Sequence, residues 1–486
     1  MSVSSTHLSR VGQLDASLDG KVVLPGDQRF DGARRAWNLA IDQRPAAVVF
    51  PGSAAEVAAA VRYAAERGLQ VAAQGTGHNA GPLGALTDTV LLRTDRMRGI
   101  RIDPQARIAR AEAGVVWLDV VQAAAQYGLA ALAGSSPDVG VTGYTLGGGM
   151  SFLGRKYGLA ASNVLAAEVV LADGRLVRAD AEHETDLFWA LRGGGGSFGI
   201  VTALEFRLFP HTQAYAGALW YPIERASEVL HAWGELTRGQ VPDELTTIGR
   251  LLNFPPIEQI PEPVRGKSFV IVEAYHLGDP AQADALLAPL RALGPVNDTI
   301  TTVPMPALSH LHMDPEQPVP GTGDGMMVDQ LPAEAIDAFV QAAGPAAAFP
   351  LLSVELRHLG GEFDRPRPGN GAVARLDAQY LMFAVSMTPV PDLVAPVTAQ
   401  VEAVKNALAP WAARQMYLNF AETQHPAAPF WTEQTYQRLH RIKANVDPYD
   451  IIRSNHPISP VRQTRAARSS TRTFSPHMMR PVSAKP

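Results

Sequence analysis

The sequence predicts an α+β protein of two or three domains, and three features of the chain indicate this. Its 486 residues exceed the usual size of one domain, which is roughly 100 to 200 residues. The 42 glycines and 38 prolines are typical of a loop-rich protein and exclude a coiled coil or a helix bundle. Segments with strand character alternate with segments of helical periodicity up to Pro210, and longer helices with separated strands follow.

The first half of the chain begins with a predicted β-α-β unit. A strand over residues 46–50 precedes a helix over residues 53–68, which Ser53 and Glu56 begin as a capping box and Gly68 ends. A second strand follows over residues 69–73. Further strands are predicted at 91–92, 99–102, 108–111, 165–171, 176–178 and 200–208, and helices at 115–127 and 184–191.

The chain after Pro210 predicts a second α+β domain whose strands form one antiparallel sheet. Helices are expected at 224–238, 281–293, 390–408 and 433–446, and strands at 268–275, 353–359, 379–388 and 415–420. No internal repeat of the period of a solenoid is present.

Composition and charge exclude several classes of site and partner. The chain has no cysteine, so it cannot contain a disulfide, a thiolate zinc site, a cysteine-held iron–sulfur cluster or a cysteine nucleophile. Six of the 42 basic residues and no acidic residue lie in the segment 461–486, which leaves 36 basic against 47 acidic residues in the rest. We expect no nucleic-acid surface on this acidic body, and we expect a disordered basic tail.

No targeting segment is visible in the sequence. The first 16 residues lack the apolar stretch of a signal peptide, and no apolar run reaches the about 20 residues of a membrane span. We therefore expect a cytoplasmic protein without a membrane partner, as a monomer or a homodimer.

Three glycine-rich loops, at 74–84, 134–149 and 193–199, are the first candidates for a binding site. Glycines let backbone N–H groups approach the phosphates of a ligand, although such loops are equally typical of simple turns. Two familiar interpretations fail because of the segments that come after the first and third loops. Gly81-Pro82 cannot begin the helix that a dinucleotide fold requires, and a strand comes after Ser197 where a nucleophile elbow requires a helix.

An ordered set of short motifs carries a family resemblance from about Arg44 to Pro460. The motifs are residues 46–51, Gln74-Gly75-Thr76-Gly77-His78-Asn79, the segment from Ser136 to Tyr144, Gly147-Gly148-Gly149, residues 155–158, 186–195 and 198–202, Tyr417-Leu418-Asn419-Phe420, Val446-Asp447-Pro448, and Arg453 to Ile458. In this set the chain resembles the berberine bridge enzyme family, within the vanillyl-alcohol oxidase superfamily.

The resemblance implies a two-subdomain flavin-binding domain of the vanillyl-alcohol oxidase type, joined to an α+β substrate domain with an antiparallel sheet. We place the FAD-binding domain at 1–212 and the substrate domain at 213–410. A C-terminal segment at 411–460 is expected to return to the FAD domain, and the basic tail covers 461–486.

The resemblance also implies FAD bonded covalently through its 8α-methyl group to His78. The residues expected around the cofactor are Gln74, Gly75, Thr76, Gly77, Asn79, Ser136, Val139, Gly140, Gly143, Tyr144, Gly148, Gly158, Asn163, Ile200, Val201 and Asn455. Many relatives form a second bond from a cysteine at the position of Ser136, so we expect a single bond here. Tyr144 replaces a frequent histidine and either hydrogen-bonds the flavin or serves as a packing aromatic. Gly134, at a position associated with oxygen access, favours an oxidase.

For catalysis the resemblance points to Tyr417 as the base, with Asn419 on the same face of a predicted strand. A tyrosine with a pKa near 10 acts as a base only where its surroundings lower that value. Many relatives have a second tyrosine where this chain has Phe420. Glu355 and Arg357 share one face of another strand and either orient the substrate or form a structural ion pair. His310 and His312 are expected to be loop residues, and no metal site is expected.

Together these inferences predict an FAD-dependent oxidase. It would remove a hydride from a C–H bond bearing a hydroxyl or an amine on a sugar or a natural-product-like small molecule, and dioxygen would be reduced to hydrogen peroxide. Two alternatives remain open: a dehydrogenase that uses another electron acceptor, and a flavin-bound cyclase without net redox.

Overall fold

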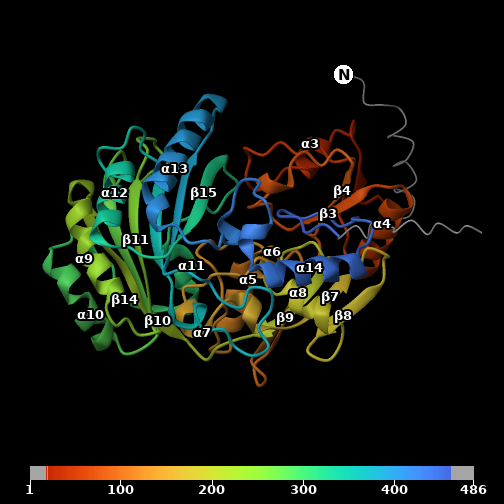
Figure 1. Ribbon diagram of the computed structural model, residues 1–486, viewed down its shortest axis with the longest axis horizontal. Coiled ribbons are helices and arrows are strands. Elements are labelled where there is room, and N and C mark those ends of the chain that lie inside the picture. The colour runs from red at the N-terminus through yellow and green to blue at the C-terminus, as the bar shows by residue number, and fades with distance from the viewer. Residues whose placement is uncertain (1–17, 19, 461–486) are drawn as a thin grey trace, which may run out of the picture.

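The computed structural model describes residue 18 and residues 20–460, and it contains three β-sheets with helices packed against them (Figure 1). The predicted α+β class is confirmed. The basic segment 461–486, which we expected to be disordered, lies outside the described residues. None of the helices in the described part combines the length and apolar character that a membrane crossing needs.

A four-stranded sheet carries the first glycine-rich loop. Its strand order is β1 (Val22–Val23), β2 (Ala47–Val49), β4 (Thr89–Arg93) and β3 (Gln70–Gln74), and β2 and β3 both run parallel to β4. Helix α4 (Ala54–Glu66) connects β2 to β3, as predicted. Ser53 accepts a hydrogen bond from the Glu56 N–H at 3.3 Å, whereas the Glu56 carboxylate accepts from Gly52 rather than from Ser53, so only half of the capping box forms.

A five-stranded antiparallel sheet completes the N-terminal half. Its order is β5 (Ile100–Asp103), β6 (Ile108–Glu112), β9 (Ile200–Arg207), β7 (Val164–Val170) and β8 (Leu176–Asp180). The predicted hairpin is the β7–β8 pair. Besides α4, the helices that the structure describes in this half are α3 (Phe30–Ala33), α5 (Trp117–Ala125), α6 (Val141–Leu146), α7 (Gly154–Tyr157) and α8 (Thr185–Leu191).

An eight-stranded antiparallel sheet forms the second half, as expected. The strands are β10 (Gln213–Pro222), β11 (Leu245–Asn253), β12 (Ser268–His276), β13 (Asn297–Asp298), β14 (Thr301–Pro304), β15 (Gly321–Val328), β16 (Ser353–His358) and β17 (Tyr380–Met387). They run in the order β13-β10-β12-β11-β16-β17-β15, and β14 also pairs with β10. The division into domains at residues 212, 410 and 460 stays a prediction.

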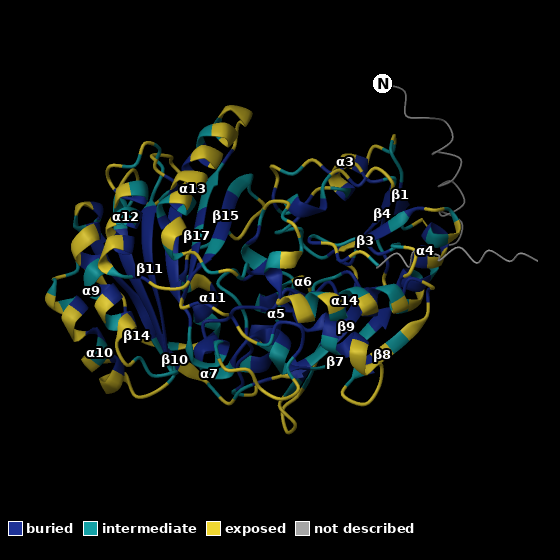
Figure 2. Cartoon of the chain, in the orientation of Figure 1, coloured by how far each residue is buried: buried dark blue, intermediate teal, exposed yellow. Residues whose placement is uncertain are grey.

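One face of this sheet is covered by helices and the other turns toward the N-terminal half (Figures 1 and 2). The covering helices are α9 (Ala226–Arg238), α10 (Pro280–Ala292), α12 (Ala333–Ala343) and α13 (Val394–Leu408). Val354 and Leu356 of β16 belong to the apolar core under these helices. Because side chains alternate along a strand, Glu355 and Arg357 point from the opposite face, toward the predicted flavin-binding loops.

The C-terminal segment returns to the N-terminal half. The predicted strand at 415–420 is wrong: Tyr417 is extended, but Leu418–Phe420 form a 3₁₀ turn, η8. Helix α14 (Glu433–Val446) has the predicted bounds. Beyond it, Ile452 forms a parallel bridge with Val71 of β3, which places residues 453–456 beside the first glycine-rich loop.

Candidate active site

One cavity of about 380 Å³ lies between the two halves of the molecule. All three glycine-rich loops contribute to its lining, together with β11, β16 and β17 of the large sheet and the C-terminal segment. The residues from the large sheet and its connections are Arg250, His312, Asp314, Ser353, Glu355, Arg357, Phe383 and Val385, and those from the C-terminal segment are Leu418, Asn419, Phe420, Glu422, Arg453, Ser454, Asn455 and His456. The cavity thus joins the predicted cofactor loops to a polar wall.

Most of the predicted cofactor residues line this cavity. They are Gln74, Gly75, Thr76, Gly77, His78, Asn79, Ser136, Val139, Gly140, Gly143, Tyr144, Ile200, Val201 and Asn455. Gly148, Gly158 and Asn163 do not line it. The ring of Tyr417 covers Gly148, while the Asn163 amide donates to the carbonyls of Tyr157 and Leu159 and so holds its own loop. These three positions were expected beside the cofactor, and they lie outside the lining of the cavity, so their role stays a prediction.

Unpartnered polar atoms in the lining show that the cavity fits a large polar cofactor such as FAD. Gln74 Oε1, Asn79 Oδ1 and Thr142 Oγ1 are buried in this cavity without a hydrogen-bond partner among the described residues. Buried polar atoms ordinarily have partners, and an unpaired one costs about 1–3 kcal/mol. Each of these atoms therefore marks a position where a bound cofactor would supply the missing hydrogen bond.

The imidazole of His78 is held on three sides. Its Nδ1 lies 2.8 Å from Thr76 Oγ1, and its Nε2 lies 3.1 Å from Asp138 Oδ1. The ring of Trp37 stacks on it with 4.0 Å between ring centroids and 19° between planes. The turn that presents His78 depends on Gly77, whose φ of +90° favours glycine.

Ser136 and Tyr144 both have partners inside the protein. The Ser136 hydroxyl donates to Asp138 at 3.1 Å, and the Tyr144 hydroxyl donates to the Leu132 carbonyl at 3.0 Å. Burial raises the pKa of Tyr144 well above its usual value. The Tyr144 ring lies 3.0 Å from where a Gly134 side chain would begin, so it fills the space that this glycine leaves. Tyr144 therefore presents its ring to the cavity, while its hydroxyl is held by the backbone.

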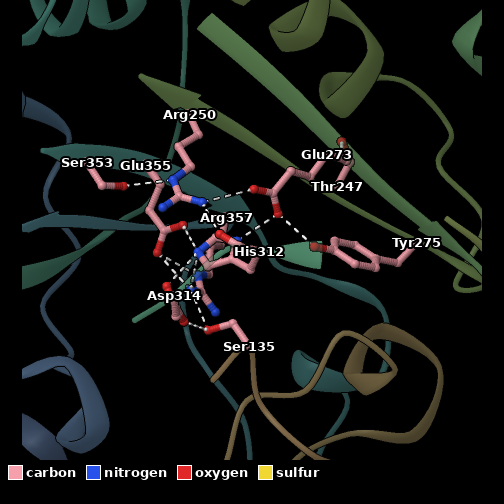
Figure 3. Close-up of polar contacts among 10 residues, drawn as sticks. All are labelled: Ser135, Thr247, Arg250, Glu273, Tyr275, His312, Asp314, Ser353, Glu355 and Arg357. Atoms are coloured by element: carbon pink, nitrogen blue, oxygen red, sulfur yellow. Dashed lines mark hydrogen bonds and ion pairs between the residues drawn. The ribbon is translucent and has the colours of Figure 1, made fainter. Parts of the chain in front are cut away.

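The polar wall is a network of buried charges around His312 (Figure 3). His312 Nδ1 lies 2.7 Å from Glu273 Oε2, and His312 Nε2 lies 3.1 Å from Glu355 Oε2. Arg357 binds the other Glu355 oxygen through Nε at 2.8 Å, and Arg250 reaches Glu273 through Nη1 at 3.3 Å. The predicted i, i+2 ion pair of Glu355 and Arg357 is therefore present, as part of a larger network.

This network fixes the protonation of its members. Burial and Arg250 oppose the charged form of His312, but Glu273, Asp314 and Glu355 outweigh them and raise the pKa of His312 to about 9. Burial would raise the pKa of Glu355, yet Arg357 and His312 hold it well below its usual value. At neutral pH the wall thus presents an imidazolium, carboxylates and guanidinium groups.

Tyr417, the predicted base, does not line the cavity. A 3₁₀ turn has three residues per turn, so Tyr417 and Phe420 lie on one side with 5.9 Å between ring centroids. Phe420 faces the cavity beneath the Arg357 guanidinium, which is 4.9 Å from its ring centroid. Tyr417 packs behind it against Gly148, and burial raises the pKa of its hydroxyl well above the usual value. The strand geometry that motivated its assignment is absent.

Asn419 and Asn455 brace the cavity from the C-terminal segment. The Asn419 amide donates to the Tyr144 carbonyl at 2.9 Å, and the Asn455 amide donates to the Asn79 carbonyl. Both residues line the cavity, so they connect the C-terminal segment to two of the glycine-rich loops.

Several residues of the site were not predicted from the sequence. Arg250 of β11 and Glu273 of β12 meet through the pairing of these strands, and His312 joins them from the turn that ends helix α11 (Leu308–Leu311). The available signal for Arg250 and Glu273 was a charged residue within an otherwise apolar strand. His312, expected in a loop, lies in the turn after α11 and is buried, whereas His310, also expected in a loop, belongs to the helix, is exposed and pairs with Glu316. In the described part of the chain, no group of three or more His, Asp or Glu side chains is placed to hold a metal ion.

Comparisons with known proteins identify the family. Residues 45–180 match the model of an FAD binding domain. YvdP of Bacillus subtilis, an uncharacterized FAD-linked oxidoreductase, is 31% identical over 313 residues, which are 63% of this chain and 67% of YvdP. The chain belongs to the FAD-linked oxidoreductases. It is therefore an enzyme with an FAD-binding domain, and the resemblance to berberine bridge enzyme-like flavoproteins is confirmed.

Two further matches describe this FAD-linked oxidoreductase. The (R)-6-hydroxynicotine oxidase of Paenarthrobacter nicotinovorans is 38% identical over 208 residues, which are 42% of this chain and 45% of that oxidase. The alignment thus spans less than half of the relative. The solved structure of Physcomitrella patens BBE-like 1 has a TM-score of 0.80 at 22% identity, over 92% of this chain and 99% of that one, which shows the shared fold.

Proposed function

We propose that this FAD-linked oxidoreductase is an oxidase of small molecules. It removes a hydride from a C–H bond that bears a hydroxyl or an amine on a sugar or natural-product-like substrate, and dioxygen is reduced to hydrogen peroxide. The observation that carries the proposal is the cavity that joins the cofactor loops to the ionised wall. Bound FAD would accept the hydride from the substrate and pass its two electrons on to dioxygen.

His78 is the proposed single tether of the cofactor. Its side chain lines the cavity on the first glycine-rich loop, and Thr76, Asp138 and Trp37 hold its ring in one orientation. Many relatives form a second bond to the flavin from a cysteine, and this chain has Ser136 at that position. A serine hydroxyl is a much weaker nucleophile than a cysteine thiolate. A single covalent bond is therefore expected.

The ionised wall is proposed to orient the substrate. Glu355 and Arg357 were the sequence candidates for this role, and both line the cavity with side chains held by their mutual contact and by His312. Because these groups are fixed by packing and ion pairs, they present charge without reorganisation as the substrate reacts. Phe420 and Phe383 supply an adjoining apolar surface, with 5.0 Å between their ring centroids.

Glu422 replaces Tyr417 as the proposed acceptor of the hydroxyl proton. It lines the cavity two residues beyond Phe420, and its backbone N–H donates to buried Asp324 at 3.1 Å. Burial, with the Asp324 carboxylate nearby, raises the pKa of Glu422 to about 8. A general base works best with a pKa near the working pH, which Glu422 meets and the buried Tyr417 does not.

Anaerobic reduction of the flavin distinguishes the two candidates. With an alcohol substrate, the reduction rate of the wild type should rise as the pH passes through about 8, because the carboxylate form of Glu422 accumulates. Glu422→Gln should abolish this rise and slow reduction by about 100-fold or more. Tyr417→Phe is the matched control and should retain the wild-type profile. The assignment is wrong if Tyr417→Phe loses the pH dependence and Glu422→Gln keeps it.

Reoxidation tests the oxidase itself. Holoenzyme reduced by substrate without oxygen is mixed with aerated buffer, and the return of the flavin absorbance is timed. In an oxidase, dioxygen reoxidises the flavin at least as fast as the enzyme turns over, and one hydrogen peroxide is released per flavin. Slow reoxidation in air would favour a dehydrogenase, and tight binding of ligands that never bleach the flavin would favour a cyclase without net redox.

A further inference from the structure

Asp138 lies beside the imidazole of His78, and although it belongs to the motif from Ser136 to Tyr144, it was not among the residues expected around the cofactor. Its Oδ1 is 3.1 Å from His78 Nε2 and also accepts the Ser136 hydroxyl at 3.1 Å. Its Oδ2 accepts the indole N–H of Trp37, whose ring stacks on His78. The carboxylate of Asp138 therefore contacts the imidazole of His78, the hydroxyl of Ser136 and the indole of Trp37.

These contacts fix the charge of Asp138 and the tautomer of His78. Burial alone would raise the pKa of Asp138, but the hydrogen bonds from His78, Trp37 and Ser136 outweigh it and the pKa is lowered. An ionised carboxylate only accepts hydrogen bonds, so His78 Nε2 carries a hydrogen. In the neutral imidazole, Nδ1 then holds the free lone pair, and its contact is the rotatable hydroxyl of Thr76 at 2.8 Å.

We propose that Asp138 is the positioning residue for covalent attachment of the flavin to His78, because it holds the hydrogen on Nε2 and leaves Nδ1 as the nitrogen that reacts. Asp138 also stabilises the positive charge that the ring acquires when Nδ1 reacts. The inference rests on the proposed tether at His78 and specifies its chemistry. Thr76 also lines the cavity, and its hydroxyl can rotate away from Nδ1. Attachment of the flavin methyl group at Nδ1 would therefore cost only the hydrogen bond between Thr76 and His78.

The bond-forming step needs only His78, the flavin and dioxygen. The new Nδ1–C bond forms as one C–H bond of the 8α-methyl group breaks, and the two electrons and the proton released pass to the flavin ring system. The imidazole becomes a cation that retains its Nε2–H, and the Asp138 carboxylate is its counter-ion. Dioxygen then takes the two electrons, that proton and one from water, and leaves as hydrogen peroxide.

A second aspartate provides a matched control. Asp138→Asn keeps the size of the side chain and an oxygen that accepts from Trp37, but it removes the negative charge. Asp31→Asn makes the same change at an exposed carboxylate that pairs with Arg34 and does not line the cavity. His78→Ala removes the attachment point. A loss seen in Asp138→Asn and not in Asp31→Asn therefore reports the charge beside His78.

The experiment follows covalent incorporation in the full-length chain. Flavin-free protein is incubated with FAD, samples are denatured over time, and the flavin retained on the chain is measured by intact mass. We expect Asp138→Asn to incorporate flavin about 100-fold more slowly than the wild type while still binding FAD that denaturation releases. Asp31→Asn should incorporate flavin at close to the wild-type rate, and His78→Ala should not incorporate it. Equal rates for Asp138→Asn and the wild type would overturn the proposal.

The bonded nitrogen is read from the wild type alone, so the test holds even where a variant fails to fold. In the isolated flavin peptide, NMR should correlate the 8α-methylene protons with the imidazole Cγ, which neighbours Nδ1. Correlation with Cδ2, which neighbours Nε2, would overturn the assignment. A wild type that carries no covalent flavin at all would refute the tether itself, which is distinguishable from a tether that forms without Asp138.

Discussion

Replacing Lys443 with methionine should lower the free energy of unfolding by about 3–5 kcal/mol, because it leaves a buried carboxylate without its cation. Lys443 and Asp447 have side chains with no exposed surface, and Lys443 Nζ lies 2.5 Å from Asp447 Oδ2. The ammonium group also donates to the carbonyls of Ser197 and Ile452, at 2.9 and 3.0 Å. Urea denaturation followed by tryptophan fluorescence measures the loss.

The control is an ion pair of similar length at the surface. Lys21 Nζ lies 2.7 Å from Glu56, and about a quarter of each side chain is exposed, so Lys21→Met should cost no more than about 1 kcal/mol. Equal losses for the two variants would contradict the assignment of Lys443 as a buried structural cation. Ser197 and Ile452 adjoin the cavity-lining residues Gly196 and Arg453, so Lys443→Met should also weaken FAD binding.

The contribution of His312 to the free energy of unfolding should fall by about 3 kcal/mol as the pH rises from 6.5 to about 9. Its folded-state pKa of about 9 lies above the unfolded value of 6.5, so the folded chain holds a proton that the unfolded chain has released. The stabilisation is complete below pH 6.5 and is lost as the pH passes through the folded value. Unfolding free energies measured across this range test the prediction.

His312→Gln is the control for this pH dependence. Glutamine offers hydrogen bonds to Glu273 and Glu355 but does not titrate, whereas Glu422, with a pKa of about 8, titrates over this range in both proteins. The difference between the two free energies of unfolding therefore reports His312, and it should change by about 3 kcal/mol between pH 6.5 and about 9. A difference that does not change with pH would contradict the prediction. Loss of the imidazolium charge also removes a cation from the polar wall, so substrate affinity is expected to change over the same pH range.

Local patterns in the sequence were sufficient for much of the fold. Helix α14 and the hairpin of β7 and β8 follow directly from periodicity, caps and turn residues. Strands β10, β11 and β15 were missed for a physical reason. The first two are buried on both faces and so lack alternation, and β15 contains three glycines in eight residues, which is untypical of a strand.

The candidate site likewise has a part that local sequence patterns predict and a part that they do not. The cofactor loops are continuous motifs, so their residues could be named from the sequence, and most of them line the cavity. The charged wall could not, because Arg250, Glu273 and Glu355 come together through the pairing of β11 with β12 and β16, and His312 reaches them from the turn after helix α11. The shared face of Tyr417 and Asn419 was predicted from a strand period, but the chain forms a 3₁₀ turn there. The i, i+2 spacing predicts a shared face only in extended chain.

The mass and absorbance of the denatured protein test the covalent flavin site most directly. We predict a yellow precipitate whose chain mass exceeds that of the bare polypeptide by one FAD, with the flavin on a peptide that contains His78 and none on a peptide that contains Ser136. A colourless precipitate with all the flavin free in the supernatant, or a flavin attached elsewhere in the chain, would contradict it.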